Sequence, residues 1–375
     1  MHDYFVQDGG AEACAVEFAR LLPSATVVTS FFDAPRFGHR IAARRVRTWP
    51  LQRIPGAARR FRAFLPLYPA WFSSVRLGPA RVVISSSSAF AHAVRRPAGA
   101  LHVAYVYTPM RFAWEPDAYL GGSSYVIPAR VAARALGPAL RRWDRRAARR
   151  PDLIVAISGT VQRRIRRLWG RHSEVIHPPV ETARFAVPTR DDGYLLVASR
   201  LLAYRRVDLA VDACRRLGRE LIVAGDGPER GRLEALAGPR TTFVGHVPRP
   251  RLIDLFAGCH AYIVPGAEDF GIAPVEAMAA GKPVIAFAGG GALETVVDGR
   301  TGVFFDRSSA DALAEAIERL GSMRLDPADA RAQAERFDVS AFRARWRDLL
   351  ARLGVDAALL ADPVAQAPDD TPVRR

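Results

Sequence analysis

Short apolar runs recur along the second half of the chain, from residue 190 onward. Between them stand segments in which apolar residues return every three or four positions, the pattern of a helix with one buried face. Strands that are apolar on both faces and alternate with helices are typical of a parallel sheet covered on both sides. We therefore predict a doubly wound α/β domain, with strands at 194–199, 220–225, 241–246, 261–266 and 283–288 and helices at 207–217, 228–238 and 249–259.

The first half of the chain repeats this theme less regularly. The apolar runs that predict strands there lie at 25–32, 80–87, 101–108 and 151–158. The stretch 177–193 is rich in proline and has no sustained periodicity, which is typical of a linker between domains. A chain of 375 residues is also long for a single core and suits two. We predict two α/β domains, at 1–185 and 186–338.

Both ends of the chain depart from this pattern. Residues 339–355 predict a terminal helix with Ser340 as its N-cap, which we expect to pack back on the N-terminal domain, and residues 356–375 predict a disordered tail. At the other end, Gly9 and Gly10 enter a helix as the loop after a strand does, yet few residues precede them. Either a short stub of strand lies there or the true start lies upstream, and the sequence leaves both open.

The composition is that of a globular protein, with 49% hydrophobic and 25% charged residues. No apolar run approaches the length of a membrane span, and residues 1–10 lack the cationic and apolar parts of a signal peptide. The three cysteines, Cys14, Cys214 and Cys259, lack the spacing of a metal site and suit a reducing compartment. We therefore expect a cytoplasmic protein, and the cysteines suggest no zinc site.

The formal net charge of +16 indicates an anionic partner. Nucleic acid, a phosphorylated ligand and an anionic membrane face are all open at this point. Every basic residue except Lys282 is arginine, and the arginines stand among acids throughout the chain without a known nucleic-acid-reading motif. No specific nucleic acid is therefore expected. A dinucleotide-dependent dehydrogenase is disfavoured because no proper glycine fingerprint follows a predicted strand.

Two acids, Glu268 and Glu276, stand on either side of a turn after the predicted strand 261–266. In an open parallel sheet, ligands bind at loops that follow the carboxyl ends of strands. We expect Pro274 at the first position of the next helix and Glu276 in its first turn, where free N–H groups favour a phosphate and a carboxylate can accept sugar hydroxyls. The alternative is that Glu276 only complements the helix dipole and Glu268 is a solvated loop acid.

Arginines follow the predicted strand 194–199. Arg200 stands at its end, and Arg205 and Arg206 come just before the next helix. Guanidinium groups that converge on one site can hold a diphosphate and offset the negative charge that builds as a bond to phosphate oxygen breaks. A solvated basic turn is the alternative for each of them.

The order of these segments resembles glycosyltransferase family 4. The motifs that carry the resemblance are QDGGAE, YTPMRFAW, PDLIVAIS and VIHPPVETARF in the first half, and SRLLAYRRVD, AGDGPE, FVGHV and PGAEDFGIAPVEAMAAGKPVIAFAGGGALETVVDGRTG in the second. They cover nearly the whole chain. The resemblance implies a retaining glycosyltransferase of the GT-B fold, in which two Rossmann-like domains, the first for the acceptor and the second for the donor, face a central cleft.

The resemblance also implies a role for each candidate residue. Glu276 would bind the ribose of a nucleotide sugar and Glu268 the hydroxyls of the transferred sugar. Arg200 matches the family's phosphate-binding arginine, and Arg205 stands where a lysine is usual, so the chemistry is assigned to Glu268, Arg200 and Arg205. Further substrate contacts are expected from Gly9, Gly10, Phe270, Gly271 and Ile272, from Tyr107 in place of a usual histidine, and from Arg111, which would take part of its work.

For the substrates, the runs 268–296 and 107–115 are most similar to bacterial mannosyltransferases that use GDP-mannose in surface polysaccharide synthesis. A UDP-sugar donor stays open, and the acceptor would be lipid-linked or an oligosaccharide. The resemblance implies an enzyme that needs no metal ion and no cofactor, because GT-B enzymes stabilise the leaving phosphate with cations and helix ends. A protein that binds a nucleotide sugar without transferring it, or a basic nucleic-acid-binding protein, is the alternative from another class.

Two arginine-rich segments bear on membrane association. Residues 57–77 interleave arginine with aromatic and leucine side chains, and residues 139–150 are mostly arginine and alanine. Such segments suit adsorption to an anionic membrane, here the inner face of the plasma membrane. The alternative is that the first is core with a solvated edge and the second an exposed helix face.

Overall fold

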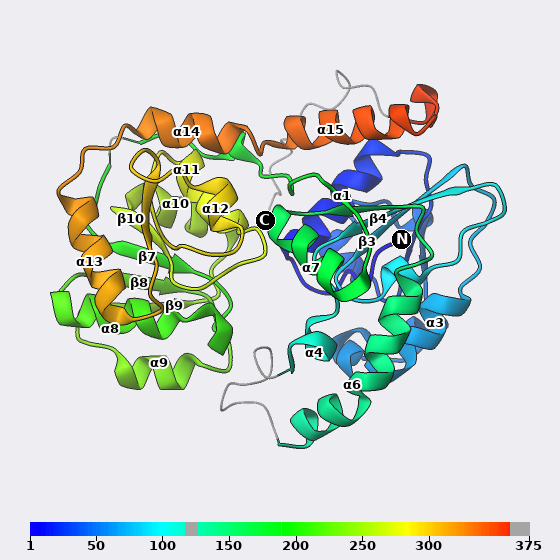
Figure 1. Ribbon diagram of the computed structural model, residues 1–375, viewed down its shortest axis with the longest axis horizontal. Coiled ribbons are helices and arrows are strands. Elements are labelled where there is room, and N and C mark those ends of the chain that lie inside the picture. Colours follow the sequence, from blue (N-terminus) through cyan, green and yellow to red (C-terminus); the bar gives the residue numbers. More distant parts are fainter. Residues whose placement is uncertain (117–126, 189, 361–375) are drawn as a thin grey trace.

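The C-terminal domain is built on a six-stranded parallel sheet, in a computed structural model that describes residues 1–116, 127–188 and 190–360 (Figure 1). The strand order is β12-β11-β10-β7-β8-β9. The strands are β7 (Leu195–Ala198), β8 (Leu221–Ala224), β9 (Thr241–Gly245), β10 (Ala261–Val264), β11 (Val284–Phe287) and β12 (Gly302–Phe305). The first five lie within the apolar runs that predicted them, which confirms the doubly wound α/β domain.

Helices cover both faces of this sheet. On one face α8 and α13 contribute to one buried apolar cluster, and on the other α10, α11 and α14 contribute to a second. The predicted helix 207–217 is confirmed to the residue as α8. The helices of this domain are α8 (Val207–Leu217), α9 (Arg230–Leu236), α10 (Arg249–Gly258), α11 (Ile272–Ala279), α12 (Ala292–Thr295), α13 (Ala310–Gly321) and α14 (Pro327–Glu335), with a 3-10 turn η6 (Ala203–Arg205).

The N-terminal domain also has a parallel sheet, and the first residues of the chain take the place of its central strand. His2 pairs with Thr29 on one side and with Ser86 on the other, so the short segment 1–5 joins two groups of strands. The short stub of strand that the sequence allowed lies here. The strands are β1 (Val27–Thr29), β2 (Val46–Thr48), β3 (Val82–Ser87), β4 (Leu101–Val106), β5 (Leu153–Ala156) and β6 (Glu174–Val175).

The helices of the N-terminal domain differ in length, and most of its 3-10 turns lie between β2 and β4. An aromatic cluster that includes Phe31, Tyr68, Phe72 and Phe90 fills the space under these turns. The helices are α1 (Gly10–Leu21), α2 (Ala34–Phe37), α3 (Tyr68–Ser74), α4 (Arg111–Trp114), α6 (Ile127–Ala147) and α7 (Gly159–Trp169), and the turns are η1 (Ala43–Arg45), η2 (Pro50–Arg53), η3 (Ala58–Leu67), η4 (Ala91–Ala93) and η5 (Thr182–Arg184).

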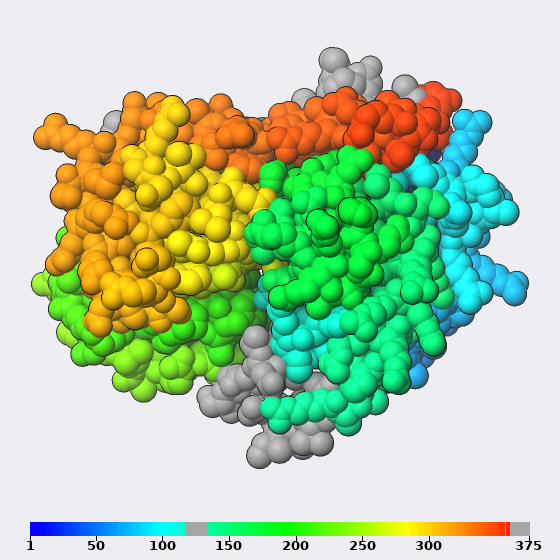
Figure 2. Space-filling model, in the orientation of Figure 1, coloured from blue at the N-terminus to red at the C-terminus, as the bar shows by residue number. Residues whose placement is uncertain are grey.

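The chain crosses between the domains twice, and the two crossings lie side by side. The Val180 N–H donates to the Phe337 carbonyl at 2.9 Å, and the Val339 N–H donates to the Val180 carbonyl at 3.2 Å. After the second crossing, α15 (Val339–Arg352) runs over the N-terminal domain, and the orange and red helices span the top of both domains in Figures 1 and 2. The Arg343 guanidinium pairs there with Glu17 of α1 at 2.7 Å.

Ser340 is not the N-cap of this terminal helix, contrary to the sequence expectation. Asp338 caps it, because its carboxylate accepts the Ser340 N–H at 2.8 Å and also the Ser340 hydroxyl at 2.6 Å. The helix therefore begins at Val339, one residue before Ser340. Beyond it, residues 357–359 form a last 3-10 turn, η7 (Ala357–Leu359), and the predicted tail lies outside the described residues from 361 onward.

Replacing Trp346 with alanine is expected to destabilise the protein by about 3–5 kcal/mol, the usual range for a buried tryptophan. The Trp346 side chain is fully buried and packs edge-on against Phe18 of α1 and Tyr105 of β4, with ring centroids 4.7 and 5.5 Å apart. Urea unfolding followed by circular dichroism measures the change. The exposed neighbour Arg345 serves as the control, and equal stability of W346A and R345A would contradict the docking of α15.

Candidate active site

The candidate residues meet at the switch point of the C-terminal sheet. After β7 the chain builds β8 and β9 on one side and then returns to place β10 on the other, so the loops after β7 and β10 diverge between neighbouring strands. Such a crevice at the carboxyl ends of strands is where open α/β sheets bind ligands. The loop after β7 carries Arg200 and Arg205, and the loop after β10 carries Glu268 and leads into α11.

Glu268 and Arg205 form an ion pair across these two loops. The Arg205 side chain is three-quarters buried, and its guanidinium also lies over the Tyr204 ring, 5.3 Å from the centroid. Burial alone would lower the pKa of Arg205, but the Glu268 carboxylate raises it above its ordinary value. A fixed positive charge is therefore held at the switch point. Arg200 is exposed at the end of β7, while Arg206 turns away and pairs with Asp208 at 3.2 Å.

Glu276 is the second acid of the site and is 6% exposed. Its Oε1 lies 2.6 Å from a guanidinium nitrogen of Arg249, the first residue of α10, and the Arg249 guanidinium also covers the Phe185 ring. Burial raises the pKa of the Glu276 carboxyl, and Arg249 opposes that shift. Glu276 is therefore a buried carboxylate that is held in an ion pair.

The helix that carries Glu276 begins earlier than the sequence predicted. Pro274 was expected at its first position, but α11 begins at Ile272, and Glu276 consequently lies in the second turn. The reason is Gly271, which has a φ of +86° and caps the helix in a conformation that disfavours other residues. Gly281, at φ +70° just beyond the helix, is the predicted stop.

The N-terminus of α1 in the other domain faces the start of α11. A Cβ atom on Gly10 would stand 2.5 Å from Cδ1 of Ile272, so the two domains approach closely here and a larger residue would displace the Ile272 side chain. A Cβ atom on Gly9 would stand 2.8 Å from the Glu12 carboxylate. Phe270 is buried, and its ring stacks on His177 with centroids 5.4 Å apart. The glycine loop, the Glu268 loop and the start of α11 are thus brought together.

Arg111 lies at the start of α4 in the N-terminal domain and reaches across to the C-terminal one. Its guanidinium pairs with the Asp269 carboxylate at 2.7 Å and lies over the Tyr204 ring, 5.0 Å from the centroid. Arg164 of α7 binds the same Asp269 oxygen at 2.6 Å. The Arg111 guanidinium therefore lies beside the Glu268 loop. Asp269 was missed by the sequence analysis, although it directly follows Glu268.

Tyr107 is placed differently from the other predicted substrate contacts. Its hydroxyl donates to the Ala11 carbonyl at 2.9 Å and lies 2.7 Å from the Ser86 hydroxyl. These bonds direct the hydroxyl to the base of α1, and the side chain is 8% exposed. In this structure Tyr107 therefore supports the helix that presents Gly9 and Gly10, and its side chain is not gathered with Arg205 and Glu268.

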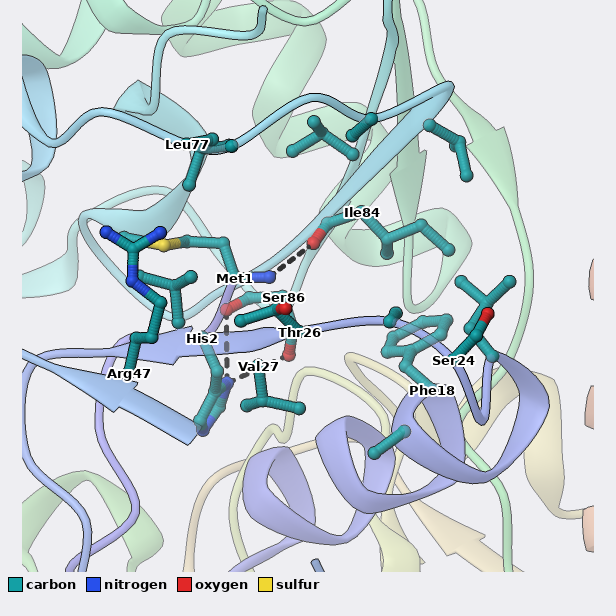
Figure 3. A pocket seen from close by; sticks show the side chains of 18 of the residues that line it. Met1, His2, Phe18, Ser24, Thr26, Val27, Arg47, Leu77, Ile84 and Ser86 are labelled. Carbon is teal, nitrogen blue, oxygen red and sulfur yellow. Dashed lines mark hydrogen bonds between the residues drawn. The ribbon is translucent and has the colours of Figure 1, made fainter. Parts of the chain in front are cut away.

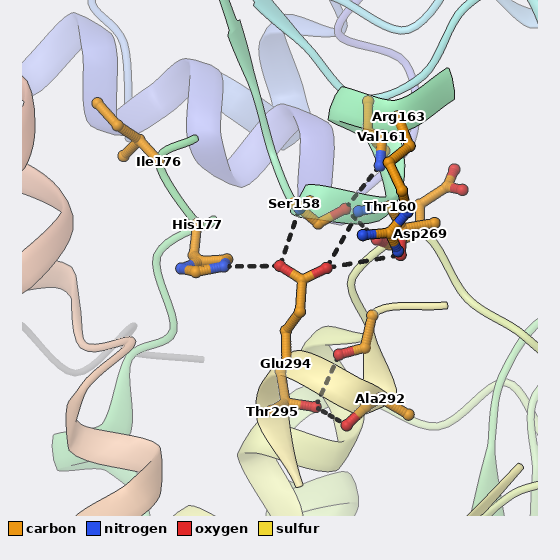
Figure 4. A network of polar contacts seen from close by, with 12 residues as sticks. Ser158, Thr160, Val161, Arg163, Ile176, His177, Asp269, Ala292, Glu294 and Thr295 are labelled. Carbon is orange, nitrogen blue, oxygen red and sulfur yellow. Dashed lines mark hydrogen bonds and ion pairs between the residues drawn. The ribbon is translucent and has the colours of Figure 1, made fainter. Parts of the chain in front are cut away.

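A second network at the domain boundary was not foreseen. The Glu294 carboxylate on α12 accepts the Gly159 N–H at 2.8 Å and the Thr160 N–H at 3.1 Å. Nε2 of His177 lies 3.1 Å from the same carboxylate (Figure 4). Burial raises the pKa of Glu294, but these hydrogen bonds outweigh burial and hold the pKa below its usual value. A carboxylate at the N-terminus of α7 is the favourable polarity for a helix end. The only sequence signal for this network is Glu294 itself, a single acid within the otherwise uncharged run ALETVV at 292–297.

Changing Glu12 to glutamine is expected to flatten the loss of stability as the pH rises from about 5 to about 8. Burial in the first turn of α1 raises the pKa of Glu12 from 4.5 to about 8. Between these values the folded chain holds a proton that the unfolded chain releases, so stability falls as pH rises, by up to about 1.4 kcal/mol per pH unit. Urea unfolding at several pH values from 5 to 9 measures the slope. Parallel curves for E12Q and the unchanged chain would contradict the prediction.

Comparisons with known proteins agree with this geometry. The family model described as Glycosyltransferase Family 4 matches residues 8–184, and the model described as Glycosyl transferases group 1 matches residues 180–337. A GDP-mannose-dependent alpha-(1-6)-phosphatidylinositol monomannoside mannosyltransferase of Mycobacterium tuberculosis is 32% identical over 284 residues, which are 65% of this chain and 73% of that protein. A D-inositol 3-phosphate glycosyltransferase of Kribbella flavida is 31% identical over 180 residues, which are 40% of this chain and 42% of that protein.

Solved structures share the arrangement of the two domains. The Anabaena protein HepE, in complex with UDP and glucose, superposes with a TM-score of 0.67 at 20% identity, covering 93% of this chain and 98% of its own. Sucrose-phosphate synthase from Thermosynechococcus elongatus superposes with a TM-score of 0.66 at 19% identity, covering 94% and 95%. The chain spans about half the length of several curated relatives, 42% of the Kribbella protein and 57% of a Mycolicibacterium smegmatis mannosyltransferase. Glycosyltransferase family models match both halves of the chain, and the chain covers 73% of the tuberculosis relative at 32% identity. The chain therefore belongs to glycosyltransferase family 4 and has the GT-B fold.

Proposed function

We propose that this chain is a retaining hexosyltransferase that moves a hexose from a nucleotide sugar to a hydroxyl group of a lipid-linked or oligosaccharide acceptor. The observation that carries the proposal is the placement of Glu268 and Glu276 on either side of the start of α11, each paired with an arginine. In this arrangement the Glu276 carboxylate accepts hydrogen bonds from the ribose hydroxyls, and the Glu268 carboxylate accepts them from the hydroxyls of the transferred sugar. The free N–H groups at the start of α11, facing Gly10, serve the diphosphate between them.

The ion pairs of the ligand-free site have a clear use in this function. A diphosphate that enters beside Arg205 offers its guanidinium a more highly charged partner than Glu268. Arg205 then turns to the phosphate, and the released Glu268 carboxylate accepts hydroxyls of the sugar. Arg200, exposed at the end of β7, adds a second cation to the same diphosphate. Donor binding thus exchanges the Arg205–Glu268 ion pair for an Arg205–phosphate pair, and hydrogen bonds from the sugar hydroxyls satisfy the Glu268 carboxylate.

In the transfer step the bond between the anomeric carbon and the phosphate oxygen breaks, and the leaving diphosphate keeps the electron pair. The acceptor oxygen forms the new bond to the same face of the carbon, and its proton passes to the leaving phosphate oxygen. The negative charge that builds on the phosphate is stabilised by Arg205, Arg200 and the helix start. These groups supply the positive charge that a metal ion would otherwise supply. The rate of hexose transfer is therefore expected to be the same with and without EDTA.

Mannose from GDP-mannose is the donor we propose first, because relatives at about 30% identity are named as GDP-mannose-dependent mannosyltransferases. A UDP-sugar is the second candidate, because HepE, which has the same fold, was solved in complex with UDP-glucose. Incubating the protein with radiolabelled GDP-mannose or UDP-glucose and an extract of bacterial lipids tests both. Label in the lipid fraction supports transfer and identifies the donor, and NMR of the product gives the anomeric configuration.

A protein that binds a nucleotide sugar without transferring it is the alternative from another class. In the same experiment it would retain label on the protein after rapid filtration and release none to lipid or oligosaccharide acceptors, even after long incubation. Inversion of the anomeric configuration would contradict the same-face step while leaving transfer itself intact.

We also propose that the N-terminal domain adsorbs to anionic membranes. Within the described parts of the chain, no helix has the length and apolar character needed to cross a bilayer. In the segment 57–77 the rings of Phe61, Tyr68 and Phe72 are buried, and the exposed residues include Arg59, Arg60, Arg62 and Leu67. Arginines beside an exposed leucine suit an anionic headgroup layer. Flotation with phosphatidylglycerol vesicles at low salt tests this, and protein that stays at the bottom of the gradient contradicts it.

A further inference from the structure

Two polar networks outside the donor site differ in what they join. His2 and Ser86 are buried, and their hydrogen bonds lie beside a cavity of about 380 Å³ between β1 and β3, all within the N-terminal domain (Figure 3). The network around Glu294 instead joins the two domains, because its carboxylate belongs to α12 and the N–H groups that it accepts belong to α7 (Figure 4). Domains of one chain commonly move relative to each other, so a contact between them depends on how they are placed.

Glu294 holds the start of α7 with both of its carboxylate oxygens. Oε2 accepts the Gly159 N–H, and Oε1 accepts the Thr160 N–H. The N-cap of the same helix, Ser158, donates its hydroxyl to the Asp269 carbonyl at 2.5 Å. Hydrogen bonds to an ionised group are stronger than those between neutral groups. The start of α7 is therefore fixed to the C-terminal domain at two points, one of which is the loop after β10.

His177 extends this network towards the hinge between the domains. Its Nε2 lies 3.1 Å from the Glu294 carboxylate, and its Nδ1 lies 3.3 Å from a guanidinium nitrogen of Arg345. A guanidinium can only donate, so Nδ1 is the acceptor and Nε2 carries the hydrogen that is donated to Glu294. These two contacts fix the orientation of the ring. We call the contacts of Glu294 with the start of α7 and with His177 the clasp.

The His177 ring packs against the donor loop, defined here as residues 265–271, and against both crossings between the domains. It stacks on Phe270 with centroids 5.4 Å apart and meets Phe337 edge-on at 5.2 Å. Phe270 and Phe337 are themselves 5.5 Å apart, so the three rings form one cluster. His177 lies just before the first crossing and Phe337 lies in the second. A movement at the crossings therefore displaces Phe270, two residues from Glu268.

We propose that Glu294 and His177 are positioning residues of the transferase: they hold Phe270, and through it Glu268, in the place that binds the transferred sugar while the two domains are closed. This inference rests on the proposed function, because it takes Glu268 as the contact of that sugar. The geometry that carries it is the chain of contacts from α7 through Glu294 and His177 to Phe270.

The two ends of the donor then differ in how much they depend on the clasp. Glu276 and its partner Arg249 both belong to the C-terminal domain, so the ribose end of the site is complete without the other domain. Glu268 stands on a loop that is held by α7 and by both crossings. Loss of the clasp is therefore expected to lower the rate of hexose transfer and to change the affinity for a free nucleoside diphosphate little.

Glu294→Gln tests the proposal at the centre of the clasp. Glutamine keeps the size of the side chain but places an NH₂ donor opposite one of the N–H groups that the carboxylate accepts. We expect kcat for hexose transfer to fall by about 10- to 100-fold, because misplacing a group by about 1 Å can cost that much. The affinity for GDP and UDP, measured by calorimetry, should change little. Asp298→Asn is the matched control, because Asp298 accepts the Phe304 N–H at 3.0 Å within its own domain, and D298N should retain kcat.

His177→Phe separates the hydrogen bond from the packing of the ring. Phenylalanine can keep the stack on Phe270 but cannot donate to Glu294. H177F is expected to lower kcat as E294Q does, and the double variant should lose little more than either single one, because both changes remove the same contact. Additive losses in the double variant would contradict a shared role.

Hydrogen exchange followed by mass spectrometry measures the clasp without turnover. In E294Q we expect exchange at least about tenfold faster in segments 159–161 and 265–271, and no change in D298N. If the unchanged chain transfers no hexose, the proposed function fails, and the exchange data still decide whether the clasp holds the donor loop. Unchanged exchange at 265–271 in E294Q, equal kcat in E294Q and D298N, or an equal loss of transfer and of nucleotide binding in E294Q would overturn the proposal.

Discussion

Replacing Arg205 with alanine is expected to lower kcat for hexose transfer by about 10²–10³-fold, the cost of removing one preorganised group that stabilises developing charge. The Arg205 side chain is three-quarters buried, and it is held over Tyr204 and against Glu268 before any donor arrives. Its loss also leaves the partly buried Glu268 carboxylate without its partner. Steady-state kinetics with saturating donor separate the effect on kcat from any effect on donor binding.

The chain offers a matched control in the next residue. Arg206 has the same charge and lies one position away, but its guanidinium pairs with Asp208 and Ser308 outside the site. R206A is therefore expected to retain kcat within a few-fold. Arg205→Lys keeps the positive charge and introduces the lysine that is usual at this position in the family. R205K should therefore recover much of the lost rate. Equal losses in R205A and R206A would show that only the general basic charge of this turn matters.

Changing Glu276 to alanine is expected to weaken nucleotide binding by about 10- to 100-fold, the range for losing hydrogen bonds to a charged group. The effect should appear with the free nucleoside diphosphate as well as with the sugar nucleotide, because Glu276 is assigned to the ribose. Isothermal titration calorimetry with GDP measures it. Glu268→Ala is expected to weaken the sugar nucleotide more than the free diphosphate, because Glu268 is assigned to the sugar.

Glu181 is the control for Glu276. It is a nearby acid with a side chain 40% exposed, and its partner is Arg184 within the same turn. E181A is expected to bind GDP as the unchanged chain does. If E276A also binds GDP normally while remaining folded, the ribose assignment is wrong, and the buried Glu276–Arg249 pair is then structural only.

The strands of both sheets were predictable because a buried parallel strand is apolar on both faces. β7, β8, β10 and β11 each stand out as an apolar run between polar turns. The strands that escaped prediction are β2, β6 and β12. The first two are short and lie at sheet edges, partly exposed, so their apolar signal is weak. β12 follows directly on the short turn after α12 and has no long helix before it to mark a repeat.

Two helix starts were predicted wrongly because the prediction relied on local residue preferences. Pro274 and Ser340 are common residues at helix starts, and each was preferred on that ground. In the structure Gly271 and Asp338 perform these functions, because a left-handed φ and a carboxylate with two donors in reach outweigh residue preference.

The places of the candidate residues on loops after strands were predictable from the sequence, and their ion pairs were not. Loops after predicted strands, together with a family resemblance, located Glu268, Glu276, Arg200 and Arg205. The partners of these acids come from distant elements, Arg249 from α10 and, for the neighbouring Asp269, Arg111 and Arg164 from the other domain. No spacing in the sequence encodes such contacts, because the fold alone brings these elements together.

The central claim is that a nucleoside diphosphate sugar binds at the start of α11, and thermal unfolding in the presence of GDP, UDP, ADP and their sugars tests it most directly. A ligand present at 100 times its dissociation constant adds about 2.7 kcal/mol to the stability of the folded state. We predict a clear rise in melting temperature with GDP or UDP and their sugars, and a smaller rise in E276A and R200A at the same concentrations. No shift with any of these ligands in the unchanged chain, at millimolar concentration, would contradict the account.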